Sequence, residues 1–324
     1  MKYWIFGGNG FVGRYLANAL LERNEQVVVC DLHDIIHEDI STVCFYQKID
    51  IRDTEGLSHL PIEKEDVVIN MAANQYHTKV PKNREEYFRS VNTEGTRNLL
   101  LTMEHKGCTK YIMFSTDMTY GKPQYLPVDA KHPQNPFGPY GKSKLLSEQI
   151  CREYRTKGIN ITIFRPRMIM GPGRAGILLK LFKLIDLNLP VPTVGNGHNH
   201  YQMISVFDCV SAVLCAIDKG VPNKEYNLGS ENAPDVRSLL QNTIRQAGKH
   251  SFVLPTPGKL VKALLRLLDA IGLTLMYPEQ FMIADEEYIL DISETMKDLG
   301  WQPKYNDADM LAEAYKMYKA KKKS

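Results

Sequence analysis

A glycine-rich loop near the N-terminus constrains the fold of this chain most strongly. It reads Gly7-Gly8-Asn9-Gly10-Phe11-Val12-Gly13 and lies between an apolar run at Tyr3–Phe6 and a helical pattern at Val12–Glu22. The glycines at positions 7, 10 and 13 permit a tight turn, close approach of the backbone to a ligand, and close helix–strand packing. Such a loop is weak evidence alone, but its place between a strand and a helix favours a βαβ unit.

Apolar runs and helical patterns alternate through the first half of the chain. The runs are Tyr3–Phe6, Gln26–Cys30, Val43–Gln47, Val67–Asn70, Tyr111–Phe114 and Ile161–Phe164, and the helical patterns are Val12–Glu22, Glu85–Glu104 and Ser143–Arg155. Near-continuous apolar strands separated by amphipathic helices indicate a parallel sheet buried on both faces. With right-handed crossovers, the sequence predicts an α/β fold with a doubly wound Rossmann sheet.

The pattern changes after Arg165, where glycines and prolines cluster and indicate loops over a cleft. We expect residues 1–165 to form the Rossmann domain and residues 166–324 to form mainly a smaller substrate-binding α/β portion, with some chain returning to the sheet. A helix from about Phe207 to Asp218, a strand at Glu225–Leu228 and a helix at Val236–Gln246 are expected there.

Lys259–Ile271 predicts an amphipathic helix with an apolar face made by Leu260, Leu264, Leu267, Leu268 and Ile271. We expect this face to pack inside the smaller domain; a partner or membrane surface is the alternative. The lysines at 319 and 321–323 predict a solvated, frayed end.

Charge and composition exclude several classes of function. A net charge of +3 without a basic patch argues against a nucleic-acid partner. No stretch approaches the roughly 20 apolar residues of a membrane span, so no membrane partner is expected. The six cysteines are scattered and lack metal-ligand spacing, which predicts reduced core residues of a cytoplasmic protein and no metal site.

Asp31, at the end of the second apolar run, indicates which ligand the loop binds. The helix after the loop points its N-terminus at a pyrophosphate, while a carboxylate at position 31 accepts hydrogen bonds from a ribose 2′-hydroxyl and repels a 2′-phosphate. A turn residue at the end of a strand is the plainer interpretation of Asp31. Together with the glycine loop, Asp31 predicts NAD rather than NADP.

Tyr140 and Lys144 form a candidate acid–base pair. At positions i and i+4 of a helix they share a face, and a nearby cation favours the phenolate form of tyrosine. This spacing is common on solvated helices, so it carries weight only with Thr116, which follows the fifth strand at the ligand-binding edge of the sheet.

The chain resembles the extended short-chain dehydrogenase/reductase superfamily, in its NAD-dependent epimerase/dehydratase branch. The resemblance covers nearly the whole chain and includes Asn70-Met71-Ala72-Ala73, Asn92-x-x-Gly95-Thr96, Pro139-Tyr140-Gly141-Lys142-Ser143-Lys144, Arg165-Pro166 with Gly171-Pro172-Gly173, Val206-x-Asp208 and Leu299-Gly300-Trp301-x-Pro303. It implies that Tyr140 is the general acid/base, that Lys144 binds the nicotinamide ribose and tunes Tyr140, and that Thr116 hydrogen-bonds the reacting oxygen.

The resemblance also implies the cofactor contacts and the assembly. The NAD-binding candidates are Gly7, Asn9, Gly10, Phe11, Val12, Gly13, Asp31, Asp50, Ile51, Met71, Ala72, Ala73, Asn92, Tyr140, Lys144, Arg165 and Pro166. A homodimer is expected through the helices Glu85–Glu104 and Ser143–Arg155, packed as a four-helix bundle; that both helices merely cover the sheet is the alternative.

Departures from the family pattern bear on the substrate. Met118 stands where nucleotide-sugar 4,6-dehydratases carry a glutamate, Met168 replaces their asparagine, and Tyr201 replaces an arginine that meets the substrate diphosphate. Positive charge can instead come from Arg167, Arg174 or Lys180, although Arg167 pairing with a carboxylate is an equal alternative. The substrate-side candidates are Asp117, Met118, His77, Arg167, Met168 and Tyr201, with His77 and Lys79 as rim residues in the plainer interpretation.

Three functions follow from these residues. The leading hypothesis is an NAD-dependent oxidoreductase or epimerase that acts on a sugar hydroxyl through a transient ketone, and a nucleotide-linked sugar is the expected substrate. The alternative is a net alcohol dehydrogenase of the 3β-hydroxysteroid type, favoured by the absent phosphate-binding arginine and the methionines at 118, 168 and 170. A binding protein with a dead site is disfavoured by the intact Thr116, Tyr140 and Lys144.

Overall fold

A seven-stranded parallel sheet forms the centre of the computed structural model, which describes residues 1–41, 43–76, 80–172, 174 and 178–323. The sheet order is β10-β6-β5-β4-β1-β2-β3. The order reverses between β1 and β4, as in a doubly wound fold. The strands are β1 (Lys2–Phe6), β2 (Gln26–Asp31), β3 (Phe45–Lys48), β4 (Val67–Asn70), β5 (Lys110–Phe114), β6 (Asn160–Pro166) and β10 (Glu225–Leu228).

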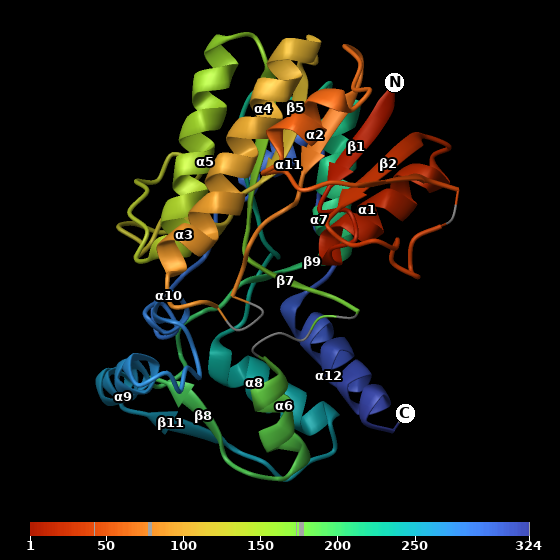
Figure 1. Ribbon diagram of the computed structural model, residues 1–324. Helices are drawn as coiled ribbons and strands as arrows, with labels where there is room; N and C mark the ends of the chain where they lie inside the picture. The colour runs from red at the N-terminus through yellow and green to blue at the C-terminus, as the bar shows by residue number, and fades with distance from the viewer. Residues whose placement is uncertain (42, 77–79, 173, 175–177, 324) are drawn as a thin grey trace.

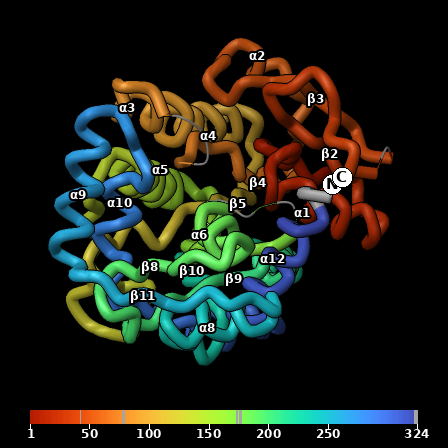
Figure 2. Tube along the Cα trace, turned by 90° about the horizontal axis from the view of Figure 1, so that it is seen from below, coloured from red at the N-terminus to blue at the C-terminus, as the bar shows by residue number. Residues whose placement is uncertain are grey.

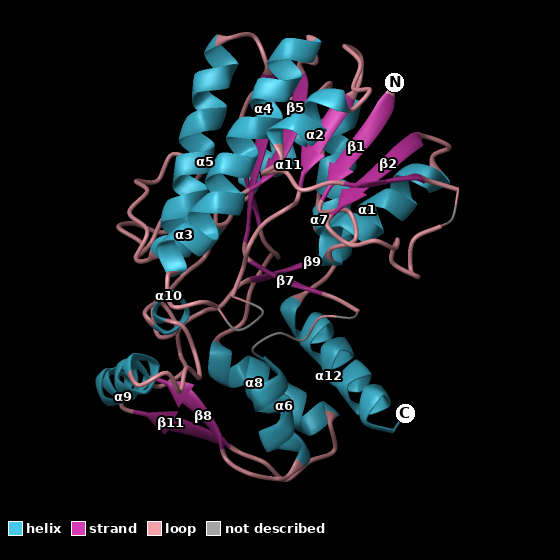
Figure 3. Ribbon diagram, in the orientation of Figure 1, coloured by secondary structure: helices cyan, strands magenta, loops and turns pink. Residues whose placement is uncertain are grey.

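Helices cover both faces of this sheet (Figures 1 and 3). Side chains along β1 alternate between two cores: Tyr3 and Ile5 join one, while Trp4 and Phe6 join the other. This alternation is the two-residue period of a strand buried on both sides. The first core is closed by α1 (Phe11–Glu22), α7 (Val206–Asp218) and α11 (Ser293–Leu299), and the second by α2 (Thr54–His59), α4 (Gly95–Lys106) and α5 (Pro139–Thr156).

A smaller lobe lies below the sheet in Figure 1 and faces the viewer in Figure 2. Its own apolar core includes Phe182, Leu240 and Leu311. Its elements are α6 (Leu178–Asp186), α8 (Val236–Gln246), α9 (Gly258–Ala270), α10 (Pro278–Phe281), α12 (Asp307–Lys323), and the strand pair β8 (Val191–Val194) and β11 (Val253–Thr256). A second pair, β7 (Met168–Met170) and β9 (Met203–Ser205), lies between the lobe and the sheet. The return of β10 to the large sheet agrees with the expectation that chain after residue 165 rejoins it, while the domain boundary itself stays a prediction.

Three expectations about elements need correction. The single helix predicted at Glu85–Glu104 is divided into α3 (Arg84–Phe88), a π-helical turn at Arg89–Glu94 and α4. The C-terminal tail is not frayed at Lys319, because α12 runs to Lys323 and the Lys319 ammonium pairs with Asp186. The leucine face of α9 is not packed inside the lobe: Leu265 is the one buried residue of that helix.

Candidate active site

The carboxyl ends of the parallel strands bring the predicted site residues to one edge of the sheet. Phe6, the last residue of β1, pairs in register with Cys30 of β2 and Asn70 of β4, so the glycine loop, Asp31 and the segment after Asn70 begin side by side. Thr116 follows β5 at the same edge. This edge is where open α/β sheets bind ligands.

The glycine loop is shaped for a phosphate-bearing ligand. A β-carbon on Gly7 would lie 2.6 Å from the Ala72 nitrogen, and one on Gly13 would lie 2.5 Å from the Gly7 carbonyl oxygen, so larger residues are excluded at both positions. Gly7 also has a φ of 77°, which favours glycine. The N-terminus of α1 has no side-chain cap, which leaves backbone N–H groups for an anion.

Asp31 is held at the mouth of this loop by backbone donors. Its carboxylate accepts hydrogen bonds from the Asn9 N–H at 3.0 Å and the Leu32 N–H at 2.8 Å. The side chain is only partly buried, with 13% of its surface exposed, so a ribose hydroxyl can still reach it. This geometry fits the dinucleotide role predicted for Asp31.

The neighbouring cofactor candidates differ in how their side chains are engaged. The Asp50 carboxylate is bound by Arg52, which lowers the pKa of Asp50, and Ile51 is buried under α4. Asn92 is buried and donates to the Ser143 hydroxyl at 2.9 Å, while accepting from the Asn74 N–H at 2.8 Å. Asn92 therefore connects the segment after β4 to α5. The cofactor candidates in this segment are partly accessible: Met71, Ala72 and Ala73.

Tyr140 and Thr116 meet in a buried setting. Tyr140 is 8% exposed and Thr116 7% exposed. Burial raises the pKa of Tyr140 above its ordinary value, and Glu279 and Asp117 raise it further, while Arg174 and the Thr116 hydroxyl lower it. A phenol in these surroundings is neutral in the free protein, so it needs additional stabilisation of its anion to act as a base.

In the chain alone, the Lys144 ammonium is buried and is bound by the backbone. Its ammonium donates a hydrogen bond to the Phe114 carbonyl at 2.9 Å, and burial lowers the pKa of Lys144 from 10.5 to about 8. Burial outweighs the favourable charges around Tyr140, so the pKa of Tyr140 lies above its ordinary value in the chain alone. The lowering of this pKa by Lys144 stays a prediction.

Glu279, which the sequence did not single out, holds the N-terminus of the catalytic helix. Its carboxylate accepts hydrogen bonds from the Tyr140 N–H at 2.9 Å, the Gly141 N–H at 3.0 Å and the Tyr76 hydroxyl at 2.7 Å. A carboxylate at a helix N-terminus is favoured by the free N–H groups and the helix dipole. The only signal in the sequence was a Pro278-Glu279 step after the leucine helix, which carries no distance information.

Asp117 and Arg167 form a buried ion pair, which is the alternative expected for Arg167; its role as an anion ligand stays a prediction. The Arg167 guanidinium lies between the rings of Tyr201, at 4.6 Å, and Tyr288, at 4.2 Å. Tyr201 therefore packs against the Arg167 guanidinium. As a neutral phenol, it supplies no positive charge for a diphosphate. Met118 and Met168 remain partly accessible beside this cluster.

Arg174 is the best placed of the three predicted cations. It is half-buried near Tyr140, lies 5.4 Å from the Phe11 ring, and donates to the Gln75 side chain at 2.9 Å. In the described part of the chain, no carboxylate pairs with it. Lys180 instead donates to the Leu275 carbonyl on the outer surface. His77 and Lys79 lie outside the described residues.

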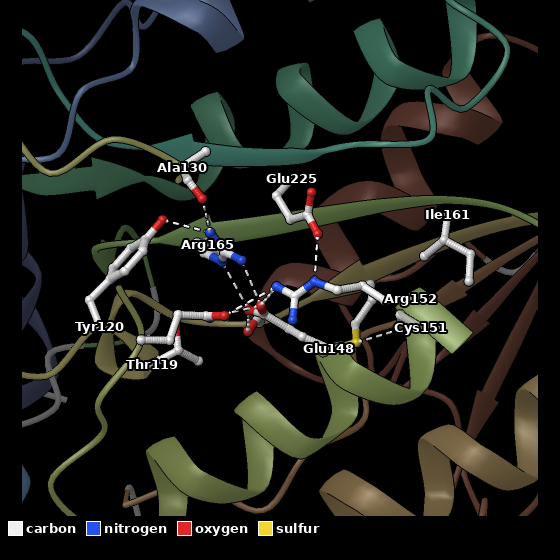
Figure 4. A network of polar contacts seen from close by, with 12 residues as sticks. Thr119, Tyr120, Ala130, Glu148, Cys151, Arg152, Ile161, Arg165 and Glu225 are labelled. Atoms are coloured by element: carbon white, nitrogen blue, oxygen red, sulfur yellow. Dashed lines mark hydrogen bonds and ion pairs between the residues drawn. The ribbon is translucent and has the colours of Figure 1, made fainter. Parts of the chain in front are cut away.

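Arg165 lies at the centre of a buried polar network (Figure 4), and its contact with the cofactor stays a prediction. Its guanidinium binds both oxygens of Glu148, at 2.9 and 2.6 Å, and donates to the Tyr120 hydroxyl and the Ala130 carbonyl. Ser115 and Arg152 complete the shell around Glu148. The network fastens α5, which carries Tyr140, to β6; contact of NAD with Pro166 stays a prediction.

The described residues were also considered as metal ligands, membrane spans and disulfides. No set of three or more His, Cys, Asp or Glu side chains suited to a metal occurs in this part of the chain. Among the same residues, no helix is long and apolar enough to cross a membrane. The described cysteines, all six of them, are free thiols.

Known proteins resemble this chain in sequence. Residues 3–229 match the model of the NAD dependent epimerase/dehydratase family. The UDP-glucose 4-epimerase of Streptococcus mutans is 29% identical and is aligned over 96% of this chain and 94% of its own. The N-acetyl-alpha-D-glucosaminyl-diphospho-ditrans,octacis-undecaprenol 4-epimerase of Escherichia coli O157:H7 is 32% identical over 78% of this chain and 75% of its own.

A solved epimerase structure has the same fold as this chain. A UDP-glucose 4-epimerase from Thermotoga maritima, solved with UDP-glucose, superposes with a TM-score of 0.78 at 22% identity and covers 99% of both chains.

Proposed function

Because the chain belongs to the NAD-dependent epimerase/dehydratase family and uses NAD, we propose that it epimerises a diphosphate-linked sugar at a ring hydroxyl. The observation that carries the proposal is the buried Thr116–Tyr140 pair beside the glycine loop and Asp31. The names of the similar enzymes point to position 4 of the sugar.

The chain's own residues define the proton path of this reaction. Tyr140 takes the proton of the sugar hydroxyl through its phenolic oxygen, while Thr116 holds the reacting oxygen in place. NAD, when bound, accepts the hydride from the same carbon and returns it. The sugar rotates within the site while it is a ketone, so that hydride returns to the opposite face of the same carbon. Tyr140 then gives the proton back to the oxygen of the sugar.

Elimination of water is disfavoured by the residues after Thr116. A 4,6-dehydration needs a group that protonates the leaving hydroxyl, and Met118 has no proton to give. Asp117 is engaged by Arg167, so its carboxylate is kept as the partner of a buried cation. Both side chains therefore support a redox-neutral inversion over a dehydration.

The carrier of the sugar is the finer part of the proposal. A nucleoside diphosphate is the first candidate, by similarity to the UDP-glucose 4-epimerases, with Arg174 as the cation for its phosphates. A lipid diphosphate is the second candidate. The name of the Escherichia coli relative, a diphospho-undecaprenol sugar epimerase, favours it. The exposed leucines of α9 also favour it, because α9 is followed in the chain by α10, whose Glu279 binds the Tyr140 N–H.

Product analysis tests the proposal against its main alternative. The purified enzyme is incubated with UDP-glucose, UDP-N-acetylglucosamine and UDP-glucuronic acid, and products and NADH are followed together. Epimers formed without accumulation of NADH support the proposal. A ketone formed with one NADH for each substrate would instead assign the net dehydrogenase activity.

A further inference from the structure

The outer face of α9 is apolar and open to solvent. Leu260, Leu264, Leu267 and Ile271 are each between 54% and 69% exposed. Leu273 and Leu275 in the following loop are 62% and 50% exposed. These six residues are called the α9 surface below.

The α9 surface is continuous along one side of the helix. At about 100° per residue, Leu260, Leu264 and Leu267 of α9 and Ile271 directly after it fall within an arc of roughly 60°. The helix is attached by its other side, through Leu265 and contacts with α10 and β8. Single exposed leucines are ordinary on a soluble protein, whereas a contiguous apolar strip marks an interaction surface.

Positive charge borders the α9 surface. Lys259 and Arg266 are exposed at its edge, and the exposed Lys180 donates to the carbonyl of Leu275. The nearby carboxylates are already neutralised, since Asp269 pairs with Arg84 and Asp285 pairs with Lys262. The rim is therefore basic, and it complements an anionic partner.

We propose that the α9 surface docks the enzyme on an anionic lipid bilayer. An amphipathic helix with leucines on one side and Lys/Arg at the edge lies in the plane of a membrane interface, with its apolar side among the acyl chains. The basic rim then contacts the anionic headgroups. A protein partner or a second copy would meet the same leucines, but neither explains the basic border as directly.

The surface is joined to the catalytic helix by a short path. Asp269 on α9 binds Arg84 with both oxygens, and Tyr277, two residues after Leu275, stacks on Tyr76 at 4.2 Å. Glu279 then holds the Tyr140 N–H. Docking would place the mouth of the site close to the bilayer surface, where the sugar diphosphate of a lipid-linked substrate lies. This consequence rests on the proposed function, whereas the docking itself does not.

Vesicle flotation of the full-length protein tests the docking. The vesicles are phosphatidylcholine with or without phosphatidylglycerol, and the variants are Leu260→Glu/Leu264→Glu and Lys259→Ala/Arg266→Ala. The matched control is Val43→Glu/Phe45→Glu, which changes two exposed apolar residues at the start of the edge strand β3. NAD binding by each variant reports that the fold is intact.

The account expects binding to vesicles that contain phosphatidylglycerol. The leucine variant should lose at least about tenfold in affinity, the basic variant should lose roughly tenfold together with its salt dependence, and the control should bind like the wild type. Absence of wild-type binding, or equal binding by the leucine variant, overturns the docking. A dimer that becomes monomeric in the leucine variant assigns the surface to a second copy and also overturns it. NAD binding and epimerisation do not depend on these outcomes. The flotation experiment therefore decides the docking alone, and the product analysis decides the proposed function.

Discussion

Burial sets the proton chemistry of the two ionisable residues at the centre of the site. Tyr140 is kept neutral and Lys144 loses part of its preference for the charged form, because both lie in a medium that penalises charge. The spacing of the two residues in the sequence identified the pair. Their burial and the hydrogen bond from Lys144 to Phe114 depend on the packing of α5 on the sheet, which spacing does not report.

Replacement of Tyr140 by phenylalanine should lower turnover by roughly 10²–10⁴-fold, the usual contribution of a general acid/base, while NAD binding stays nearly intact. Tyr154→Phe is the matched control, since Tyr154 is a buried tyrosine on the same helix. Single-turnover hydride transfer measures the effect. An unchanged rate in Tyr140→Phe would move the catalytic assignment elsewhere.

The lowered pKa of Lys144 predicts a pH dependence of stability. Between about pH 8 and 10.5 the unfolded chain keeps a proton that the folded chain releases, so stability rises with pH in that window. Relative to Lys144→Met, the free energy of unfolding of the wild type without cofactor should rise by up to about 3 kcal/mol across this pH window. Urea unfolding of both proteins at several pH values measures the difference, and a constant difference would contradict the lowered pKa.

Asp31 should make the enzyme prefer NAD over NADP by roughly 2–4 kcal/mol, which is about 30- to 1000-fold in affinity. The cause is repulsion of the 2′-phosphate together with loss of the ribose hydrogen bonds. Titration of the wild type and Asp31→Asn with both cofactors checks it. The preference should shrink in the variant, and equal NADP binding by the wild type would refute the role of Asp31.

At the scale of elements, many strands and helices were predictable because their apolar periods are strong. Val67–Asn70, Glu225–Leu228 and Val236–Gln246 were predicted at their observed bounds. The leucine period of α9 gave the helix but not its environment, because a stripe of leucines looks alike whether it is buried or exposed. The partner of Arg165 was likewise hidden, since Glu148 lies on another element.

The contact between α10 and the start of α5 gives a prediction at this scale. Glu279→Gln leaves a neutral side chain with one acceptor oxygen for the N–H groups of Tyr140 and Gly141, so the helix start should loosen. We expect a stability loss of about 0.5–2 kcal/mol and a fall in kcat larger than the change in KM. Glu104→Gln, at an exposed position of α4, is the control. A variant as stable and active as that control would remove Glu279 from the positioning of Tyr140.

At the scale of the whole molecule, α4 and α5 offer a surface for a second copy. Leu101 on α4 and Leu146 on α5 are exposed, and we propose that they lie in a four-helix dimer interface. Leu146→Glu should convert a dimer into a monomer in light scattering at micromolar concentration. A monomeric wild type would contradict the proposal, and an unchanged dimer would move the interface elsewhere.

The hydrogen atom at the reacting carbon of the sugar distinguishes epimerisation from net oxidation. With UDP-glucose deuterated at position 4, a redox-neutral inversion takes the deuteride from that carbon and returns it to the same carbon from the opposite side. The account predicts an epimer that retains the deuterium and no lasting absorbance from NADH. Deuterium lost from the product, or a ketone released with one deuterated NADH for each turnover, would contradict the account.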